Sequence, residues 1–309
     1  MKFFFIINGR KDKSIIVQEV GKQLRMLAPS FEEWNDQVDI YITTGEGDAT
    51  RFVRLYCDLH PAEETCFIAC GGDGTINEVA SGLVGFQNKS MSVVNIGGNS
   101  DFVKYFPDRD FKSIHDILAG ETIALDIIKV NDSYSFNVAD VGFDADVSSF
   151  ADEYSLLGKK DPFKRGIARA LLFSRYNKIS VTADGKKLGN RLLLCILANG
   201  RIYGDGMLCA PKASMTDGII DVVFLRPMLL WRFLCSLPTY IRGEHLESLW
   251  FKHKIIYCKA KHLEIESKRD LINIGLDGEV VPGTKFTVDI LPKAINFRLP
   301  KAKEPASEH

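Results

Sequence analysis

The sequence predicts an α/β domain followed by an all-β domain, and two changes of pattern along the chain carry this prediction. Up to about residue 122, short apolar runs alternate with amphipathic stretches. This order is typical of a doubly wound parallel sheet with helices on both faces. From residue 123 onward, short alternating runs are separated by turn residues, which favours an antiparallel β-sandwich. We therefore expect an α/β domain over 1–122 and a β-sandwich over 123–290.

The elements of the first domain follow from their apolar spacing. Four short apolar runs predict buried strands, at 3–7, 38–42, 66–70 and 91–94. Between the first two strands, Val17, Val20, Leu24 and Leu27 recur at helical spacing. Strands and helices that alternate in this way place the loops after each strand at one edge of a parallel sheet, where such sheets bind ligands.

The second domain shows the shorter rhythm of an antiparallel fold. The expected strands lie at 179–181, 192–197, 219–225, 263–265 and 286–290, and Asp184-Gly185 predicts a hairpin turn after the first of them. One apolar stretch, 228–237, has helical rather than strand spacing, and we expect this helix to end at Pro238. The sequence therefore predicts a sandwich with one packed helix in this region.

Composition is that of an ordinary globular enzyme. The chain has 309 residues, of which 46% are hydrophobic and 26% charged, enough for two cores. A net charge of -1 gives no general attraction for nucleic acid. Seven cysteines without metal-ligand spacing predict reduced core residues of a cytoplasmic protein. No apolar run approaches the ~20 residues of a membrane span, so we expect any membrane contact to be peripheral.

The most informative motif is Gly71-Gly72-Asp73-Gly74-Thr75, between an apolar run and a helical pattern. Glycines let backbone amides approach an anion, and a helix N-terminus favours phosphate there. Thr75 and Glu78 form the spacing of a capping box, which predicts that the helix begins at Thr75. Asp73 would repel phosphate, so it points to a metal, a metal-bound water or the proton of an attacking hydroxyl. A solvated turn is the alternative.

The run from Gly71 to Val79 resembles the nucleotide-binding signature of the diacylglycerol kinase catalytic family, which includes sphingosine, ceramide and bacterial lipid kinases. Further motifs follow the family's order along nearly the whole chain: Asn8-Gly9, Thr43-Thr44, Gly47-Asp48-Ala49, Gly97-Gly98-Asn99-Ser100-Asp101-Phe102, Leu125-Asp126-Ile127, Gly142-Phe143-Asp144-Ala145, Asn199-Gly200, Tyr203-Gly204, Asp217-Gly218, Arg242-Gly243-Glu244-His245 and Asp277-Gly278-Glu279. Three departures stand out: Gly98-Asn99-Ser100 replaces the usual Thr-Gly-Asn, Gly9 replaces a proline, and Asp205 interrupts a glycine run.

This resemblance implies an ATP- and Mg²⁺-dependent kinase that phosphorylates a lipid hydroxyl. Phosphoryl transfer needs amide donors, Mg²⁺ and carboxylates that hold the metal or take a proton. The implied nucleotide contacts are Asn8, Thr44, Gly71, Gly72, Gly74, Thr75, Glu78, Gly97, Gly98 and Ser100. Helix capping alone would also explain Thr75. The resemblance further implies that 291–309 packs back onto the first domain.

The implied catalytic residues are three carboxylates. Glu279 or Asp73 would activate the lipid hydroxyl, and we favour Glu279; Asp277 stands beside it. A plain hairpin turn is the alternative for Asp277-Gly278. The implied metal ligands are Asp73, Asp126 and Asp217, the last as the ligand of a second, structural Mg²⁺. For Asp217 a simple turn is the alternative.

The expected substrate is a lipid at a membrane surface. Residues 159–178 carry seven cations against one acid, with apolar residues on one helical face, which is typical of a segment that lies on an anionic leaflet. An ordinary solvated helix is the alternative. We expect diacylglycerol as the leading substrate, with sphingoid bases, ceramide or other lipids next. A dinucleotide kinase and a non-catalytic lipid-binding regulator are the rival classes. A homodimer is the assembly we consider.

Overall fold

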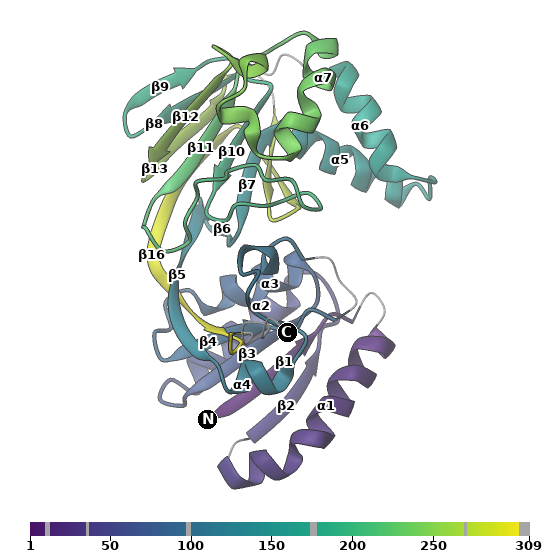
Figure 1. Ribbon diagram of the computed structural model, residues 1–309, viewed down its shortest axis with the longest axis vertical. Helices are drawn as coiled ribbons and strands as arrows, with labels where there is room; N and C mark the ends of the chain where they lie inside the picture. Colours follow the sequence, from purple (N-terminus) through teal and green to yellow (C-terminus); the bar gives the residue numbers. More distant parts are fainter. Residues whose placement is uncertain (10–12, 35–36, 97–99, 174–177, 269–270, 303–309) are drawn as a thin grey trace, which may run out of the picture. The chain divides into compact units, whose positions relative to one another are not determined.

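The computed structural model divides the chain into two compact units (Figure 1). Unit 1 comprises Met1–Leu125 with Lys293–His309, and unit 2 comprises Asp126–Pro292. Two long strands, β5 (Glu121–Val130) and β16 (Lys285–Leu299), contribute residues to both units. The structure describes residues 1–9, 13–34, 37–96, 100–173, 178–268 and 271–302.

Unit 1 is built on a parallel sheet, as the alternating pattern predicts. Its strand order is β2 (Gln37–Ile42), β1 (Lys2–Ile7), β3 (Thr65–Cys70), β4 (Lys89–Val93) and then the end of β16, where Phe297 pairs with Met91. Because β16 returns the chain to this sheet, the residues near the C-terminus complete the core of unit 1.

Helices cover both faces of this sheet, which confirms the doubly wound class. On one face, α1 (Lys13–Trp34) and α4 (Ile114–Leu118) pack on Phe3, Phe5 and Ile7 of β1. On the other face, Phe4 contacts the rings of Phe52 and Tyr56 on α2 (Asp48–Leu59), which packs beside α3 (Asp73–Leu83). Since both faces are covered, β3 is buried at every position.

Unit 2 is a sandwich of two sheets. The six-stranded antiparallel sheet has the order β12 (Ile255–Ala260), β11 (Ile220–Leu225), β10 (Leu194–Ala198), β7 (Val138–Gly142), β14 (Ile272–Leu276) and β15 (Glu279–Gly283). Facing it are β16, β13 (His262–Ser267), β8 (Ile179–Ala183) and β9 (Lys186–Gly189), with β5 and β6 (Ser133–Ser135). One apolar core unites the two sheets, so the predicted β-sandwich is confirmed.

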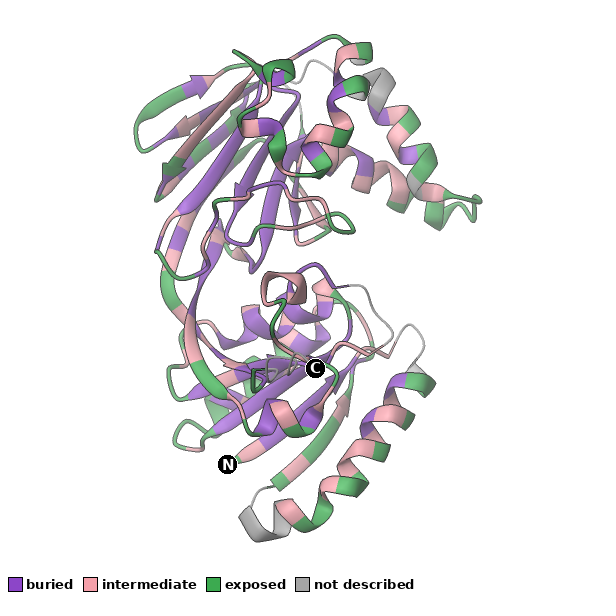
Figure 2. Cartoon of the chain, in the orientation of Figure 1, coloured by how far each residue is buried: buried purple, intermediate pink, exposed green. Residues whose placement is uncertain are grey.

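A helical layer covers the outer face of the six-stranded sheet. It consists of α5 (Phe143–Leu156), α6 (Pro162–Phe173) and α7 (Leu230–Ile241). Along β10, Cys195 and Leu197 face the sandwich core, whereas Leu194, Ile196 and Ala198 face the helices. Figure 2 shows the resulting continuous burial of the central strands. Short 3₁₀ turns at Val103–Tyr105, Glu244–Leu246 and Leu249–Phe251 complete the fold.

Two local expectations are wrong. Helix α7 does not end at Pro238 but continues to Ile241, because the next amides resume the ladder and Arg242 N donates to Pro238 O at 3.2 Å. Not every cysteine is a core residue either: all seven are free, but Cys235 is exposed and Cys258 is half-buried. Among the described residues, no helix combines the length and apolar composition that crossing a bilayer requires.

Candidate functional site

The glycine-rich turn of unit 1 leads from a buried strand directly into a helix. β3 ends at Cys70, and α3 begins at Asp73 with Gly72 as its N-cap. A side chain at Gly71 would lie 2.5 Å from Thr75 Oγ1, whereas one at Gly72 would meet nothing within 4 Å. Only glycine therefore fits at Gly71, while Gly72 borders open space at the end of the helix where amide dipoles favour an anion.

The predicted capping box is wrong, since α3 starts two residues before Thr75. The hydroxyl of Thr75 instead accepts a hydrogen bond from Asn8 Nδ2 at 3.1 Å, which ties the end of β1 to the first turn of α3. Glu78 accepts a hydrogen bond from Ala49 N at 3.0 Å, so it caps the N-terminus of the neighbouring helix α2. The motif thus joins three segments of unit 1.

Asp73 is held by the segment that follows β4. Its Oδ1 accepts hydrogen bonds from Ser100 Oγ at 2.5 Å and Phe102 N at 3.3 Å, and its Oδ2 accepts one from Asp101 N at 3.1 Å. These donors are uncharged, so the carboxylate is oriented while its charge remains available. Gly97 and Gly98, the other predicted contacts of this segment, lie outside the described residues.

Thr44 lies at the start of a second polar group of unit 1. Its amide and hydroxyl donate to Asp48 Oδ2, at 2.8 and 2.9 Å, and Tyr41 OH donates to the same oxygen at 3.2 Å. These bonds, that of the Thr44 amide first, lower the pKa of Asp48 below its usual value. The structure therefore brings Thr44 to the N-terminus of α2, and Asn8 and Thr75 to that of α3.

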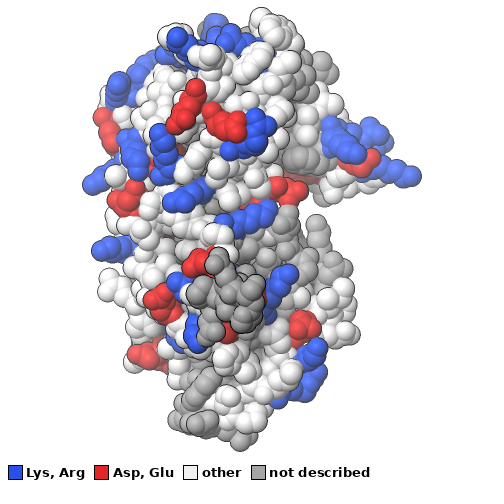
Figure 3. Space-filling view, in the orientation of Figure 1, with Lys and Arg blue, Asp and Glu red and all other residues white. Residues whose placement is uncertain are grey.

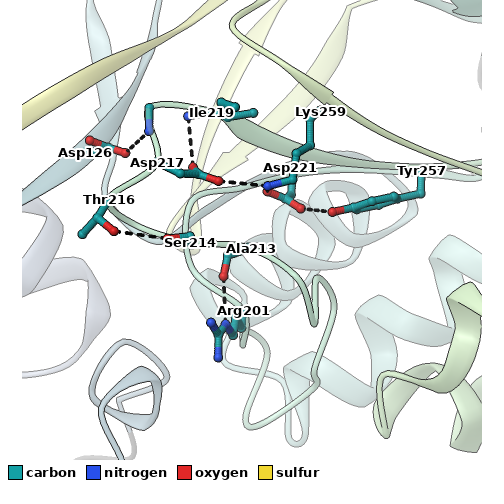
Figure 4. A network of polar contacts seen from close by, with 11 residues as sticks. Asp126, Arg201, Ala213, Ser214, Thr216, Asp217, Ile219, Asp221, Tyr257 and Lys259 are labelled. Atoms are coloured by element: carbon teal, nitrogen blue, oxygen red, sulfur yellow. Dashed lines mark hydrogen bonds and ion pairs between the residues drawn. The ribbon is translucent and has the colours of Figure 1, made fainter.

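In unit 2, Asp126 is fully buried on β5 and serves as a backbone acceptor. Its Oδ2 accepts a hydrogen bond from Gly218 N at 2.7 Å (Figure 4). Its amide donates to Met215 O at 2.8 Å. Asn199 Nδ2 donates to its carbonyl at 2.8 Å. The carboxylate therefore fastens the loop before β11 to β5.

Asp277 and Glu279 lie at a tight hairpin. Strands β14 and β15 pair with Leu276 opposite Glu279, so Asp277 and Gly278 form the two-residue turn, with φ of 51° and 92°. This is the hairpin that the sequence offered as the alternative for Asp277. Its carboxylate also accepts backbone hydrogen bonds from Phe136, Asn137 and Val138, at 2.6, 3.0 and 2.8 Å. Asp277 thus anchors the turn that positions Glu279.

Comparison with known families decides the identity. A model described as the diacylglycerol kinase catalytic domain matches residues 2–130, and one described as the YegS C-terminal NAD kinase beta sandwich-like domain matches 137–298. The chain belongs to the family of diacylglycerol kinase-like lipid kinases. The two matched regions together account for both the glycine-rich turn and the hairpin of Asp277. The predicted family and enzyme class are confirmed.

Relatives match this lipid kinase along more than nine-tenths of their length. The chain is 29% identical over 304 residues to a probable lipid kinase YegS-like from Yersinia enterocolitica, covering 96% of each. It is 28% identical over 293 residues to a diacylglycerol kinase from Bacillus subtilis, covering 91% of this chain and 92% of the other. A crystal structure of a diacylglycerol kinase from Bacillus anthracis shares the fold, with a TM-score of 0.68, 18% identity and coverage of 99% and 98%.

Sequence reasoning missed an acidic cluster in the lipid kinase's second unit. Asp140 on β7 and Asp144 and Asp146 on α5 lie close enough for their charges to interact. Burial and the neighbouring carboxylates raise the pKa of Asp140 well above its usual value, and burial first of all raises that of Asp144 to about 6. Tyr203 OH donates to Asp144 and lies 3.3 Å from Tyr240 OH. The three acids, spaced by four and then two residues in an otherwise apolar run, were the available signal.

The predicted metal ligands differ in how well they fit a magnesium ion. In the part of the chain that the structure describes, no three histidine, cysteine or acidic side chains converge as a metal site. A nucleotide-bound Mg²⁺ needs only one or two protein carboxylates beside phosphate and water, and Asp73 fits that demand. Asp217 does not, because its Oδ2 is 2.9 Å from Lys259 Nζ and its Oδ1 accepts a hydrogen bond from Ile219 N.

Proposed function

We propose that this lipid kinase transfers the γ-phosphate of ATP to the primary hydroxyl of diacylglycerol, with Mg²⁺, to form phosphatidic acid. The observation that carries the proposal is the arrangement around Asp73. An open glycine turn at the N-terminus of α3 adjoins a carboxylate that three uncharged donors hold in one orientation. Amides that receive phosphate and a carboxylate that can bind Mg²⁺ are the parts that phosphoryl transfer needs.

Each predicted site residue of unit 1 that the structure describes then has a physical role. The amides of the turn at Gly71, Gly72 and Gly74 receive phosphate oxygens, and Asn8 keeps Thr75 in place beneath them. Asp73 holds the magnesium ion, which would neutralise charge that develops on the transferred group. Ser100 keeps Asp73 aligned. Thr44 and Glu78, the other predicted nucleotide contacts of unit 1, support the N-terminus of the neighbouring helix α2.

For the acceptor side we propose Glu279 as the general base. A base must reach the substrate hydroxyl and be held still. The turn Asp277-Gly278 holds Glu279, the residue after the turn, because three backbone amides fix the Asp277 carboxylate. Asp277 therefore acts as a positioning residue, and Asp126 supports the same unit through Gly218.

Membrane contact is proposed at the hairpin of helices α5 and α6. Leu156 and Leu157 are 91% and 61% exposed, and Lys159, Lys160, Lys164 and Arg165 are exposed around the connection. Figure 3 shows these blue side chains gathered where the α5–α6 connection projects from unit 2. Leucines that enter the interface and cations that meet anionic headgroups together suit a leaflet surface. Residues 174–177, including Arg175, lie outside the described residues.

Phosphate transfer to a lipid panel tests the reaction. The purified protein is incubated with labelled ATP, Mg²⁺ and micelles of diacylglycerol, monoacylglycerol, sphingoid base, ceramide or undecaprenol. We expect labelled phosphatidic acid from the native protein, no product from Asp73→Asn, and native activity from Asp58→Asn, an exposed acid on α2. Labelling of the sphingoid base or ceramide alone would replace diacylglycerol by the second candidate. Equal labelling by Asp73→Asn would refute the role of Asp73.

Vesicle flotation tests the membrane contact separately. Native protein should float with vesicles that contain phosphatidylglycerol and less with pure phosphatidylcholine. The double change Leu156→Ser/Leu157→Ser should lose flotation, whereas Leu55→Ser/Leu59→Ser, which alters two leucines of α2 that are 60% and 68% exposed, should not. Equal losses in both double variants would refute docking through this hairpin.

A further inference from the structure

A lysine and two aspartates form a closed charge cluster at one end of the six-stranded sheet of unit 2. Asp221 on β11 pairs directly opposite Lys259 on β12. Lys259 Nζ lies 2.9 Å from Asp217 Oδ2 and 3.5 Å from Asp221 Oδ2 (Figure 4). The ammonium therefore bridges the strand to the loop that precedes it.

The carboxylate of Asp221 makes this cation necessary. Its side chain is 0% exposed, and its Oδ1 accepts a hydrogen bond from Tyr257, two residues before Lys259 on β12. A buried carboxylate without a counter-charge is strongly destabilising. Because Tyr257 is neutral, the positive charge at Asp221 comes from Lys259, whose pKa the hydrogen bond with Asp217 raises.

Asp217, the second partner of Lys259, connects the cluster to the loop before β11. Its Oδ1 accepts a hydrogen bond from Ile219 N at 3.2 Å. The next residue, Gly218, has a φ of 68° and donates its amide to Asp126 Oδ2 at 2.7 Å. Lys259 thus closes a chain of contacts that runs from β12 through the loop to the buried carboxylate on β5.

We propose that Lys259 Nζ is the resident cation of this site, so that unit 2 folds without a divalent ion at Asp217. Mg²⁺ requires about six oxygens at about 2.1 Å in near-octahedral geometry. Here one oxygen of Asp217 faces the ammonium and the other a backbone amide, and a second cation would meet the charge of Lys259 at close range. The predicted structural Mg²⁺ is therefore replaced by a side chain.

With Lys259 at Asp217, the magnesium requirement of the kinase rests on the nucleotide site. If Asp217 takes no divalent ion, the Mg²⁺ that supports activity is the nucleotide's alone. The protein without nucleotide should then have the same thermal stability in EDTA as in millimolar Mg²⁺, Mn²⁺ or Ca²⁺. Removal of the ammonium should open the cluster of two carboxylates to such an ion.

Thermal unfolding without nucleotide or lipid tests the inference independently of kinase activity. The test variant is Lys259→Met, which keeps the length of the stem and removes the charge. The matched control is Lys261→Met, an exposed lysine just beyond the same strand. Breaking the buried pair should lower the Tm of Lys259→Met by about 6–12 °C in EDTA. Millimolar Ca²⁺ or Mn²⁺ should restore part of this loss, and Lys261→Met should match the native protein throughout.

Two results would overturn the inference. The first is a native Tm that rises with divalent ions and loses this rise in Asp217→Asn, since an ion would then bind beside Lys259. The second is a Lys259→Met protein with the native Tm in EDTA. Should Lys259→Met fail to fold, Lys259→Arg provides the readout: it retains the charge and must fold with a Tm that divalent ions do not change.

Discussion

Replacement of Asp277 by asparagine separates positioning from chemistry at the hairpin beside Glu279. In the native protein the Asp277 carboxylate accepts hydrogen bonds from the amides of Phe136, Asn137 and Val138. Asparagine keeps the size of the side chain and one carbonyl oxygen. Its NH₂ group cannot accept a hydrogen bond, so it faces at least one backbone donor that loses its partner.

The expected cost follows from these three contacts. A hydrogen bond to a charged group contributes about 1.5–3 kcal/mol, and one to a neutral group about 1 kcal/mol. Loss of the charge over three bonds, with one donor left unpaired, therefore costs about 3 kcal/mol of folding free energy. For a unit of this size, that corresponds to a Tm lower by about 6–12 °C. The hairpin then holds Glu279 less well, so kcat should fall in parallel.

The matched control is Asp184→Asn, at the other Asp-Gly hairpin of unit 2. Asp184 also has a positive φ, of 44°, and accepts backbone hydrogen bonds from Lys261 and His262, but it is exposed. Its replacement should cost less than about 1 kcal/mol and leave kcat unchanged. The assays are thermal unfolding and steady-state phosphate transfer. An Asp277→Asn protein with native Tm and no activity would refute positioning and assign Asp277 to the chemistry itself.

Three further predictions follow from single contacts. Because burial raises the pKa of Asp144 to about 6, the folded state binds a proton that the unfolded state releases near pH 4; stability should fall as the pH rises from about 4 to 6, with Asp144 contributing up to about 3 kcal/mol, and Asp144→Asn should make this fall smaller in unfolding curves across that range, while Asp140, whose pKa is also raised, retains its part. Ser100→Ala removes one bond to the Asp73 carboxylate and should lower kcat about tenfold, measured by phosphate transfer, and lower Tm by a few degrees, measured by thermal unfolding. Glu78→Gln should weaken the cap of α2 by about 1 kcal/mol and speed hydrogen exchange at Ala49.

Much of the fold was predictable because strands that are buried on both faces are continuously apolar in sequence. Runs such as Cys66–Cys70 are apolar at each position, since helices cover both faces of the sheet. β10 is apolar at every position too, but one of its faces contacts the sandwich core and the other contacts a helical layer. Apolar content alone does not distinguish these two environments; helical spacing predicted the segments of α6 and α7, whereas α5 was not predicted.

The helix start at the glycine turn shows where local spacing fails. Thr75 and Glu78 have the spacing of a capping box, yet each has its partner in another segment of unit 1. Asn8 is 67 residues from Thr75, and Ala49 is 29 residues from Glu78. Such contacts depend on strand order, which a local pattern does not contain. The glycines were predictable because their requirement, space for the backbone, is local.

The aspartates differ in what lies beside them rather than in what their oxygens accept, and this difference supports Asp73 as the centre of the kinase site. Asp48, Asp126 and Asp277 each accept backbone amides of a neighbouring segment, and in that role an aspartate fastens the fold. Asp73 is also hydrogen-bonded, but it stands in the first turn of a helix next to Gly72, where a side chain would meet open space. A carboxylate at a helix N-terminus that is held beside such an opening can meet a ligand. Sequence alone gives all four the same letter; only their surroundings in the fold distinguish them.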